Sequence, residues 1–264
     1  MAVIAVASAK GSPGTTITSL AFTLSWPRRL ILAECDPAGG DIAAGYLRHL
    51  ELDGSRGLMQ LLVAGLRGQA INDVWQQLVD LTPPEQSRLL LPGITNPGQA
   101  VSLAPSWTGL WSFFASLEYA DPPFDVIVDC GRLIAPHAPW PLLGRTDLVL
   151  LVVRPTLSSL LPAHTVLASL DASAIRDHVG LVVVGDGQYD DRTVAQKIGV
   201  PVLAHLPRDD RSAHALAHGG TVLTRRPLLR AAAAAEPPIT TTISRYRERL
   251  HGSSPREEAR RVNL

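Results

Sequence analysis

The sequence has few cysteines, few lysines and no excess of charge of either sign. Two cysteines in 264 residues, Cys35 and Cys130, are too few for a disulfide framework, and neither lies in a zinc-ligand pattern. The 24 basic and 24 acidic side chains cancel, so no general attraction to nucleic acid or anionic lipid is expected. No apolar run reaches the ~18–20 residues of a membrane span, and the N-terminus lacks a signal-peptide pattern. We therefore expect a cytoplasmic protein.

What the chain does contain is a regular alternation of two kinds of segment. Hydrophobic residues make up 46% of the chain and charged residues 18%, which is typical of a globular protein. Short apolar runs without clean polar alternation indicate strands buried on both faces of a sheet. They cover residues 2–8, 29–34, 125–130, 147–153, 180–185 and 201–206. Helical patterns cover residues 15–25, 57–66, 71–80, 107–119, 157–171, 190–198 and 210–218.

This alternation predicts an α/β fold, a doubly wound and mostly parallel sheet with helices on both faces. The segments 88–93 and 100–105 are expected to add a further strand or an edge hairpin. Residues 1–236 are predicted to form one domain. Residues 237–264 are predicted to form a C-terminal extension, with a short helix over 239–250 and a loosely ordered tail of about a dozen residues.

A glycine-rich segment, SAKGSPGTT at residues 8–16, lies between the first predicted strand and the first predicted helix. Backbone N–H groups of such a loop point at a bound anion, and the helix dipole favours its negative charge. Gly11 and Gly14 allow close approach of the backbone, and the Thr16 hydroxyl can ligate Mg²⁺ beside phosphates. Lys10 is notable because Lys197 is the only other lysine. The alternative is a tight strand-to-helix turn that binds nothing.

The segment KGSPGTT resembles the deviant Walker A motif, K-G-G-x-G-K-[ST], of the MinD/ParA family of P-loop ATPases. These are dimerising switches that position cell-division, chromosome, plasmid or pilus machinery. The resemblance implies ATP and Mg²⁺ as cofactors, with Thr16 on magnesium. It also implies a homodimer in which Lys10 reaches the phosphates of the partner subunit's ATP. The implied nucleotide-binding residues of the loop are Lys10, Gly11, Ser12, Pro13, Gly14, Thr15 and Thr16.

Two acidic segments follow in the order that the family shows. LAECDPAGGD resembles the family's D-x-D-P-x-x-x-x-D region, which implies that Asp36 lies near the metal and orients the attacking water. Glu34 and Asp41 match two further acids of that region, although the same letters also fit a simple turn. PPFDVIVDCG resembles a Walker B strand, in which Asp129 would hold magnesium through a water molecule. Lys10 and Asp36 are thus the implied catalytic residues.

Three later segments complete the resemblance over residues 2–220. In LVLLVVRPTLSSL, Arg154 ends a strand and is a candidate replacement cation; the alternative is a side chain that simply reaches solvent. Gly185 and Asp186 occupy the region where the family has an asparagine that reads adenine, which puts base recognition by that side chain in doubt. The segment containing Pro207, Arg208 and Asp209 resembles the family's loop that wraps the adenine.

The loop departs from the family pattern at two positions. Ser12 replaces a glycine, and Thr15 replaces the lysine that holds the β- and γ-phosphates within one subunit. That lysine makes charge-assisted hydrogen bonds worth roughly 1.5–3 kcal/mol each. Its loss is expected to weaken ATP binding by about one to two orders of magnitude. Catalysis should suffer more, because phosphoryl transfer depends on neutralising developing charge.

The resulting functional hypothesis is a nucleotide-linked dimerising switch in spatial positioning, with weak or absent ATP hydrolysis. The alternative is a non-hydrolysing scaffold that resembles degenerate Tad-pilus members of the family and dimerises without nucleotide. Either role requires a protein partner, which the sequence does not identify. No aromatic and basic array indicates nucleic-acid binding. The thin apolar stripe of 239–250 favours a helix docked on the domain over a membrane contact.

Overall fold

The computed structural model describes the chain except residues 12, 51, 53–55, 67–73, 172–175 and 253–264. Among the described residues, eight strands form one sheet in the order β3-β4-β2-β5-β1-β6-β7-β8. All neighbouring pairs are parallel except β3 and β4. The strands are β1 (Val3–Ser8), β2 (Leu30–Glu34), β3 (Val79–Asp80), β4 (Arg88–Leu91), β5 (Asp125–Arg132), β6 (Leu148–Val153), β7 (Val179–Val184) and β8 (Val202–Leu206).

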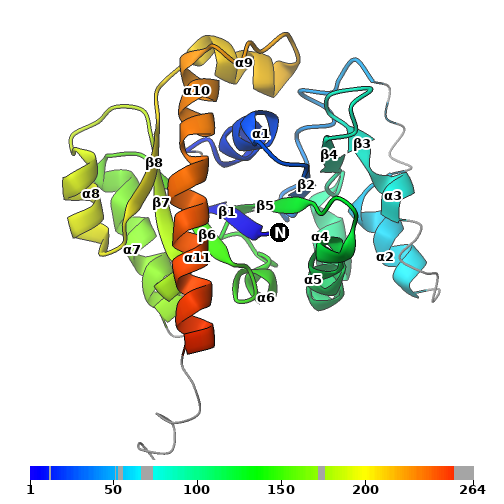
Figure 1. The fold of residues 1–264 in the computed structure, drawn as a ribbon, viewed down its shortest axis with the longest axis horizontal. Helices are drawn as coiled ribbons and strands as arrows, with labels where there is room; N and C mark the ends of the chain where they lie inside the picture. Colours follow the sequence, from blue (N-terminus) through cyan, green and yellow to red (C-terminus); the bar gives the residue numbers. More distant parts are fainter. Residues whose placement is uncertain (12, 51, 53–55, 67–73, 172–175, 253–264) are drawn as a thin grey trace, which may run out of the picture.

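Helices cover both faces of this sheet (Figure 1). Successive residues of a strand point to opposite faces, so each central strand contributes to two separate cores. In β1, Val3 and Ala5 pack on one face, whereas Ile4 and Val6 pack on the other. The helices are α1 (Thr15–Ser25), α2 (Leu58–Leu66), α3 (Val74–Gln77), α4 (Ala100–Leu103), α5 (Trp107–Ser116), α6 (Trp140–Leu143), α7 (Leu157–Asp171), α8 (Asp191–Ile198), α9 (Asp210–His218), α10 (Pro227–Ala234) and α11 (Glu236–Gly252).

The predicted doubly wound sheet is confirmed, and most of the predicted elements are present. Two edge segments differ from expectation. Residues 100–105 form α4 and a 3₁₀ turn instead of a strand, because Ala100 and Leu103 bury one helical face. The helix predicted over 71–80 is only α3, followed by β3; residues 71–73 lie outside the described residues. Short apolar runs fit either structure, and tertiary contacts decide between them.

The C-terminal helix α11 docks on the domain, as its sequence predicts. It begins at Glu236, and in Figure 1 it continues the column started by α10. Ile239 and Ile243 are buried in the same core as α1 and α10. Arg247 bonds to Asp147 at 2.8 Å and donates to the Met1 carbonyl at 2.8 Å, which ties the helix to the start of β1. The predicted tail lies outside the described residues.

None of the helices in the described part of the chain combines the length and the apolarity that crossing a bilayer requires.

A buried carboxylate organises the end of the sheet opposite the phosphate loop. Asp125, at the start of β5, is 3% exposed. It accepts hydrogen bonds from the Ala2 backbone N–H at 2.7 Å, the Trp26 indole N–H at 2.8 Å and the Arg28 guanidinium at 2.7 Å. One side chain therefore joins β1, the end of α1 and the start of β5, which sets where the phosphate loop begins.

We predict that Asp125→Ala destabilises the protein by about 3 kcal/mol, because it leaves two buried N–H donors without an acceptor. Chemical denaturation measures this change. Glu118→Ala is the matched control, because Glu118 is exposed near the same end of the molecule, and its effect should stay within about 0.5 kcal/mol. Equal effects of the two variants would contradict the prediction.

Candidate functional site

The glycine-rich loop leaves the carboxyl end of β1 and enters α1 through residues with left-handed backbone. Gly14 is the residue before α1 and has φ 101°, and Gly11 has φ 80°. A side chain added at either glycine would meet no atom within 4 Å, so open space lies in front of the loop. Lys10 is exposed, and Ser12 lies outside the described residues. The loop therefore combines the conformation and the access that a bound anion requires.

The two threonines that open α1 differ in their surroundings. Thr15, which replaces the family lysine, is only 8% exposed, and its carbonyl accepts a hydrogen bond from Ser19 at 3.1 Å. The Thr16 side chain lies close enough to the Asp129 carboxylate to favour its ionised form and lower its pKa. The predicted magnesium hydroxyl and the predicted Walker B aspartate are thus brought together by the fold.

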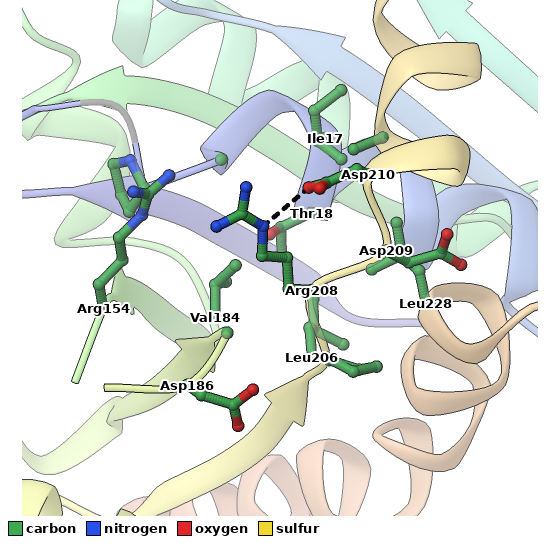
Figure 2. Close-up of a pocket in the computed structure, with 15 residues that line it drawn as sticks. Ile17, Thr18, Arg154, Val184, Asp186, Leu206, Arg208, Asp209, Asp210 and Leu228 are labelled. Carbon is green, nitrogen blue, oxygen red and sulfur yellow. Dashed lines mark hydrogen bonds and ion pairs between the residues drawn. The ribbon is translucent and has the colours of Figure 1, made fainter. Parts of the chain in front are cut away.

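A cleft of about 350 Å³ lies beside the loop (Figure 2). Its walls come from the loop and the start of α1, the residue that follows β6, the end of β7, the segment from the end of β8 into α9, and α10. Pro207, Arg208 and Asp209, which the sequence assigns to base binding, all line it. The cleft therefore runs from the phosphate loop to the segment expected to hold a base, which is the layout that a nucleotide requires.

Asp209 and Asp210, in the segment that follows β8, form hydrogen bonds and ion pairs with neighbouring side chains. Asp209 is bonded to Arg226 at 2.7 Å and accepts the Ser212 hydroxyl at 2.7 Å. Burial would raise the pKa of Asp209, but these hydrogen bonds prevail and hold it at about 2. Asp210 is bonded to Arg208 at 2.9 Å. The Asp209 carboxylate thus caps α9 and fixes the shape of the segment.

Gly185 and Asp186 also line the cleft, where the family asparagine is expected. Gly185 has φ 71°, and its N–H donates to the Leu206 carbonyl at 2.9 Å, which joins the ends of β7 and β8. Sequence analysis missed the apolar lining residues Ile17, Leu206 and Leu228. Their apolar character is the same signal that marks a core residue, so only their position in the fold separates the two roles.

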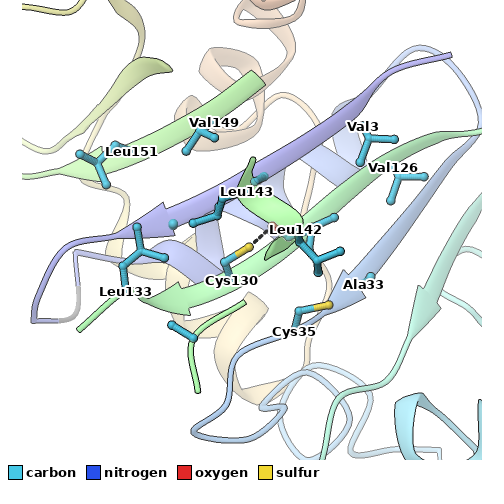
Figure 3. Packing of buried hydrophobic residues seen from close by; sticks show 14 of the residues in the cluster. Val3, Ala33, Cys35, Val126, Cys130, Leu133, Leu142, Leu143, Val149 and Leu151 are labelled. Carbon is cyan, nitrogen blue, oxygen red and sulfur yellow. Dashed lines mark hydrogen bonds between the residues drawn. The ribbon is translucent and has the colours of Figure 1, made fainter. Parts of the chain in front are cut away.

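Asp129 lies in the second half of β5, in register with Val6 of β1 and Glu34 of β2. The strand around it is packed in the apolar core that Figure 3 shows, where Cys130 and Cys35 are both buried. Burial raises the pKa of Asp129 to about 7, although hydrogen bonds from Thr16 and from the Gly131 N–H act to lower it. The site therefore holds a desolvated carboxyl group that a nearby cation would stabilise in its ionised form.

Asp36 lies directly against Gly131, two residues past Asp129. A Cβ at position 131 would overlap the Asp36 carboxylate, and Gly131 has φ 60°. Asp36 accepts the Ala38 N–H at 2.8 Å. Burial raises its pKa, and the charge of Arg132 opposes that rise. The fold thus brings Asp36 and Asp129 to the same edge of the sheet, as the sequence predicts.

Glu34 is the last residue of β2, level with Asp129, and it supports the segment that carries Asp36. It is 2% exposed and accepts the N–H groups of Ile42 at 2.9 Å and Gly93 at 3.2 Å. Burial raises the pKa of Glu34 to about 7, against these hydrogen bonds. Its side chain therefore fixes the segment that carries Asp36 and Asp41 against the segment after β4.

These residues fit a magnesium ion held mainly by phosphates and water. No group of three or more histidines, cysteines or acids that could hold a metal exists among the described residues. Mg²⁺ beside a nucleotide does not need such a group, because it keeps several waters and takes one or two protein oxygens. The Thr16 hydroxyl and the buried Asp129 carboxylate supply that donor set.

No protein-family model and no curated protein matches the chain. Solved structures do match it. The ParA family ATPase of Chlorobium tepidum TLS shares 18% identity, covers 88% of this chain and 96% of its own, and has a TM-score of 0.71. The MinD cell division protein of Aquifex aeolicus shares 16% identity over 91% of this chain and 97% of its own, with a TM-score of 0.69.

A third structure is the septum site-determining protein MinD complexed with Mg-ADP from Pyrococcus horikoshii OT3. It shares 17% identity over 89% of this chain and 93% of its own, with a TM-score of 0.68. At these identities the likeness concerns the fold, and it extends over nearly the whole length of each chain. This chain therefore has the P-loop fold of the MinD and ParA ATPases, a mostly parallel eight-stranded sheet with helices on both faces.

Proposed function

We propose that this protein binds ATP and Mg²⁺ and acts as a nucleotide-linked dimerising switch in spatial positioning, with weak or absent hydrolysis. The observation that carries the proposal is the proximity of the Thr16 side chain to the buried Asp129 carboxylate, beside an open glycine loop and a nucleotide-sized cleft. Similar MinD and McdA structures are described as complexes with Mg-ADP and with ATP, which supports the same ligand class here.

Each part of the site has a role in this proposal. The backbone N–H groups of Gly11, Gly14, Thr15 and Thr16 bind phosphate oxygens. Thr16 and Asp129 hold the metal, which when bound neutralises phosphate charge. Asp36, at the same sheet edge, orients the attacking water. Lys10 is exposed and available to the nucleotide of a partner subunit. The cleft beside Pro207 and Arg208 accepts the base and ribose.

The scaffold alternative has one observation in its favour. Thr15 is buried, and its hydroxyl is neutral, so its side chain brings no positive charge to the phosphates. If binding fails for that reason, the sheet and its helices would still form a protein surface, and dimerisation would not depend on nucleotide. The MinC:MinD complex of Aquifex aeolicus is a protein complex of the same fold.

The first prediction concerns turnover. Wild-type protein should bind fluorescent mant-ATP in the presence of Mg²⁺ and hydrolyse ATP slowly. Thr15→Lys should tighten binding by about 10–100-fold and raise turnover by at least about tenfold, because a positioned cation stabilises developing charge. Phosphate release and a mant-ATP titration measure both effects. Fast wild-type hydrolysis that the lysine does not increase would refute weak hydrolysis.

The second prediction concerns dimerisation. Sedimentation should show a monomer without nucleotide and a dimer with ATP and Mg²⁺, and Lys10→Ala should abolish the dimer while leaving mant-ATP binding within about threefold. Lys197→Ala is the matched control, because this second lysine lies on α8 over the Tyr189 ring, 4.9 Å from its centre. A dimer that forms equally with and without nucleotide would support the scaffold alternative instead.

The third prediction concerns Asp36. Gly131→Ala should push the Asp36 carboxylate away, because its Cβ would occupy the same space and its backbone is left-handed. Measured in the Thr15→Lys background, ATP turnover should fall by at least about tenfold, while mant-ATP affinity changes by less than about threefold. Gly109→Ala is the control, because a Cβ there meets no atom within 4 Å. Unchanged turnover in Gly131→Ala would remove Asp36 from its assigned role.

A further inference from the structure

Arg154 lies beside the phosphate loop because of the register between β1 and β6. These strands are parallel neighbours, and Ala7 of β1 is level with Leu151 of β6. Lys10 follows Ala7 by three residues, and Arg154 follows Leu151 by three residues. Both strands have ended at these positions. Neighbouring strands are only about 4.8 Å apart, so the Arg154 backbone emerges next to the beginning of the loop.

The backbone at this point is fixed by hydrogen bonds. The Arg154 N–H donates to the Ser159 hydroxyl at 2.9 Å, and the Arg154 carbonyl accepts the Thr156 N–H at 2.8 Å. The next carbonyl, that of Pro155, accepts the Gln188 N–H at 2.9 Å, which ties this turn to the segment after β7. The turn therefore sets the starting point and direction of the Arg154 side chain.

The side chain extends into the cleft toward the loop. Figure 2 shows the Arg154 guanidinium directed at the chain between β1 and α1. Arg154 and Pro13 and Gly14 of the loop line the same cleft. The other basic residue in the described lining is Arg208, which bonds to Asp210 at 2.9 Å. Arg154 thus brings positive charge to the loop from within the same subunit.

We propose that Arg154 binds the β- or γ-phosphate of the nucleotide, an inference that rests on the proposed function. Arg154 then takes over the role of the family lysine that Thr15 replaces. A guanidinium presents a planar fork of N–H donors that matches two phosphate oxygens and stays charged at any physiological pH. It reaches the phosphates from β6 instead of from α1. The ligand class is therefore a nucleoside di- or triphosphate, and a nucleoside monophosphate lacks the group that Arg154 contacts.

The test is a titration of the full chain with mant-ATP, mant-ADP and mant-AMP in Mg²⁺. Arg154→Ala should weaken mant-ATP binding by about 10–100-fold and mant-AMP binding by less than about threefold. Arg154→Lys should retain part of the affinity, because it keeps the charge and loses the fork. Adding Thr15→Lys to Arg154→Ala should restore mant-ATP binding to within about threefold of wild type, because one cation then replaces the other.

Arg192→Ala is the control, since Arg192 is exposed on α8 and outside the cleft lining, and it should leave all three affinities unchanged. Unchanged mant-ATP binding in Arg154→Ala would overturn the inference, and so would an equal loss for mant-AMP or a failure of Thr15→Lys to rescue. If neither wild type nor Thr15→Lys binds any of the nucleotides, the proposed function itself fails. Circular dichroism and thermal melting of each variant establish that a loss of binding does not reflect unfolding.

Discussion

The register of three parallel strands, β1, β2 and β5, is the constraint on which the site depends. Because Val6, Glu34 and Asp129 lie level with one another, the loops that leave these strands meet at one edge. The Thr16 side chain then lies near the Asp129 carboxylate at that edge. A slip of one residue in β5 would turn Asp129 to the opposite face of the sheet and separate the two groups. Core packing on both faces of the sheet prevents such a slip.

The same register concentrates negative charge in a dry environment. Burial raises the pKa of both Glu34 and Asp129 to about 7, so ionising them costs free energy in the protein alone. Glu34 is compensated by backbone N–H donors, and its role is to hold the neighbouring segment. Asp129 has a hydroxyl and one backbone N–H as donors. A hydrated cation at this edge of the sheet would stabilise the ionised form of Asp129.

The positive charge at this site comes from different positions than the positive charge in the deviant Walker A motif that the sequence resembles. In the loop, the position at which the family has its phosphate-binding lysine is occupied by Thr15, which is buried. An arginine from β6, the strand on the other side of β1, lines the cleft beside the same loop. Parallel strands bring several chain segments to one phosphate site, so the origin of a cation in the chain matters less than its position. The residues of the loop alone therefore give too low a count of the positive charge beside it, because they leave out Arg154.

The sequence by itself determined the fold class and the position of the glycine-rich loop between the first strand and the first helix. Buried strands without polar alternation, separated by helical patterns, allow few architectures other than a doubly wound sheet, and the glycines at 11 and 14 mark the turn into α1. It also indicated Thr16, Asp36 and Asp129, because each follows or ends a recognisable element. It failed at 100–105 and at 71–80, where short apolar segments at the edge of the sheet fit helix and strand equally well. Only the tertiary structure decided that Thr16 lies near Asp129, that Asp36 contacts Gly131, and that Arg154 lines the same cleft as the loop. Those contacts join residues more than 90 positions apart in the sequence. Strand order and strand register decide such contacts, and local sequence patterns encode neither strand order nor register.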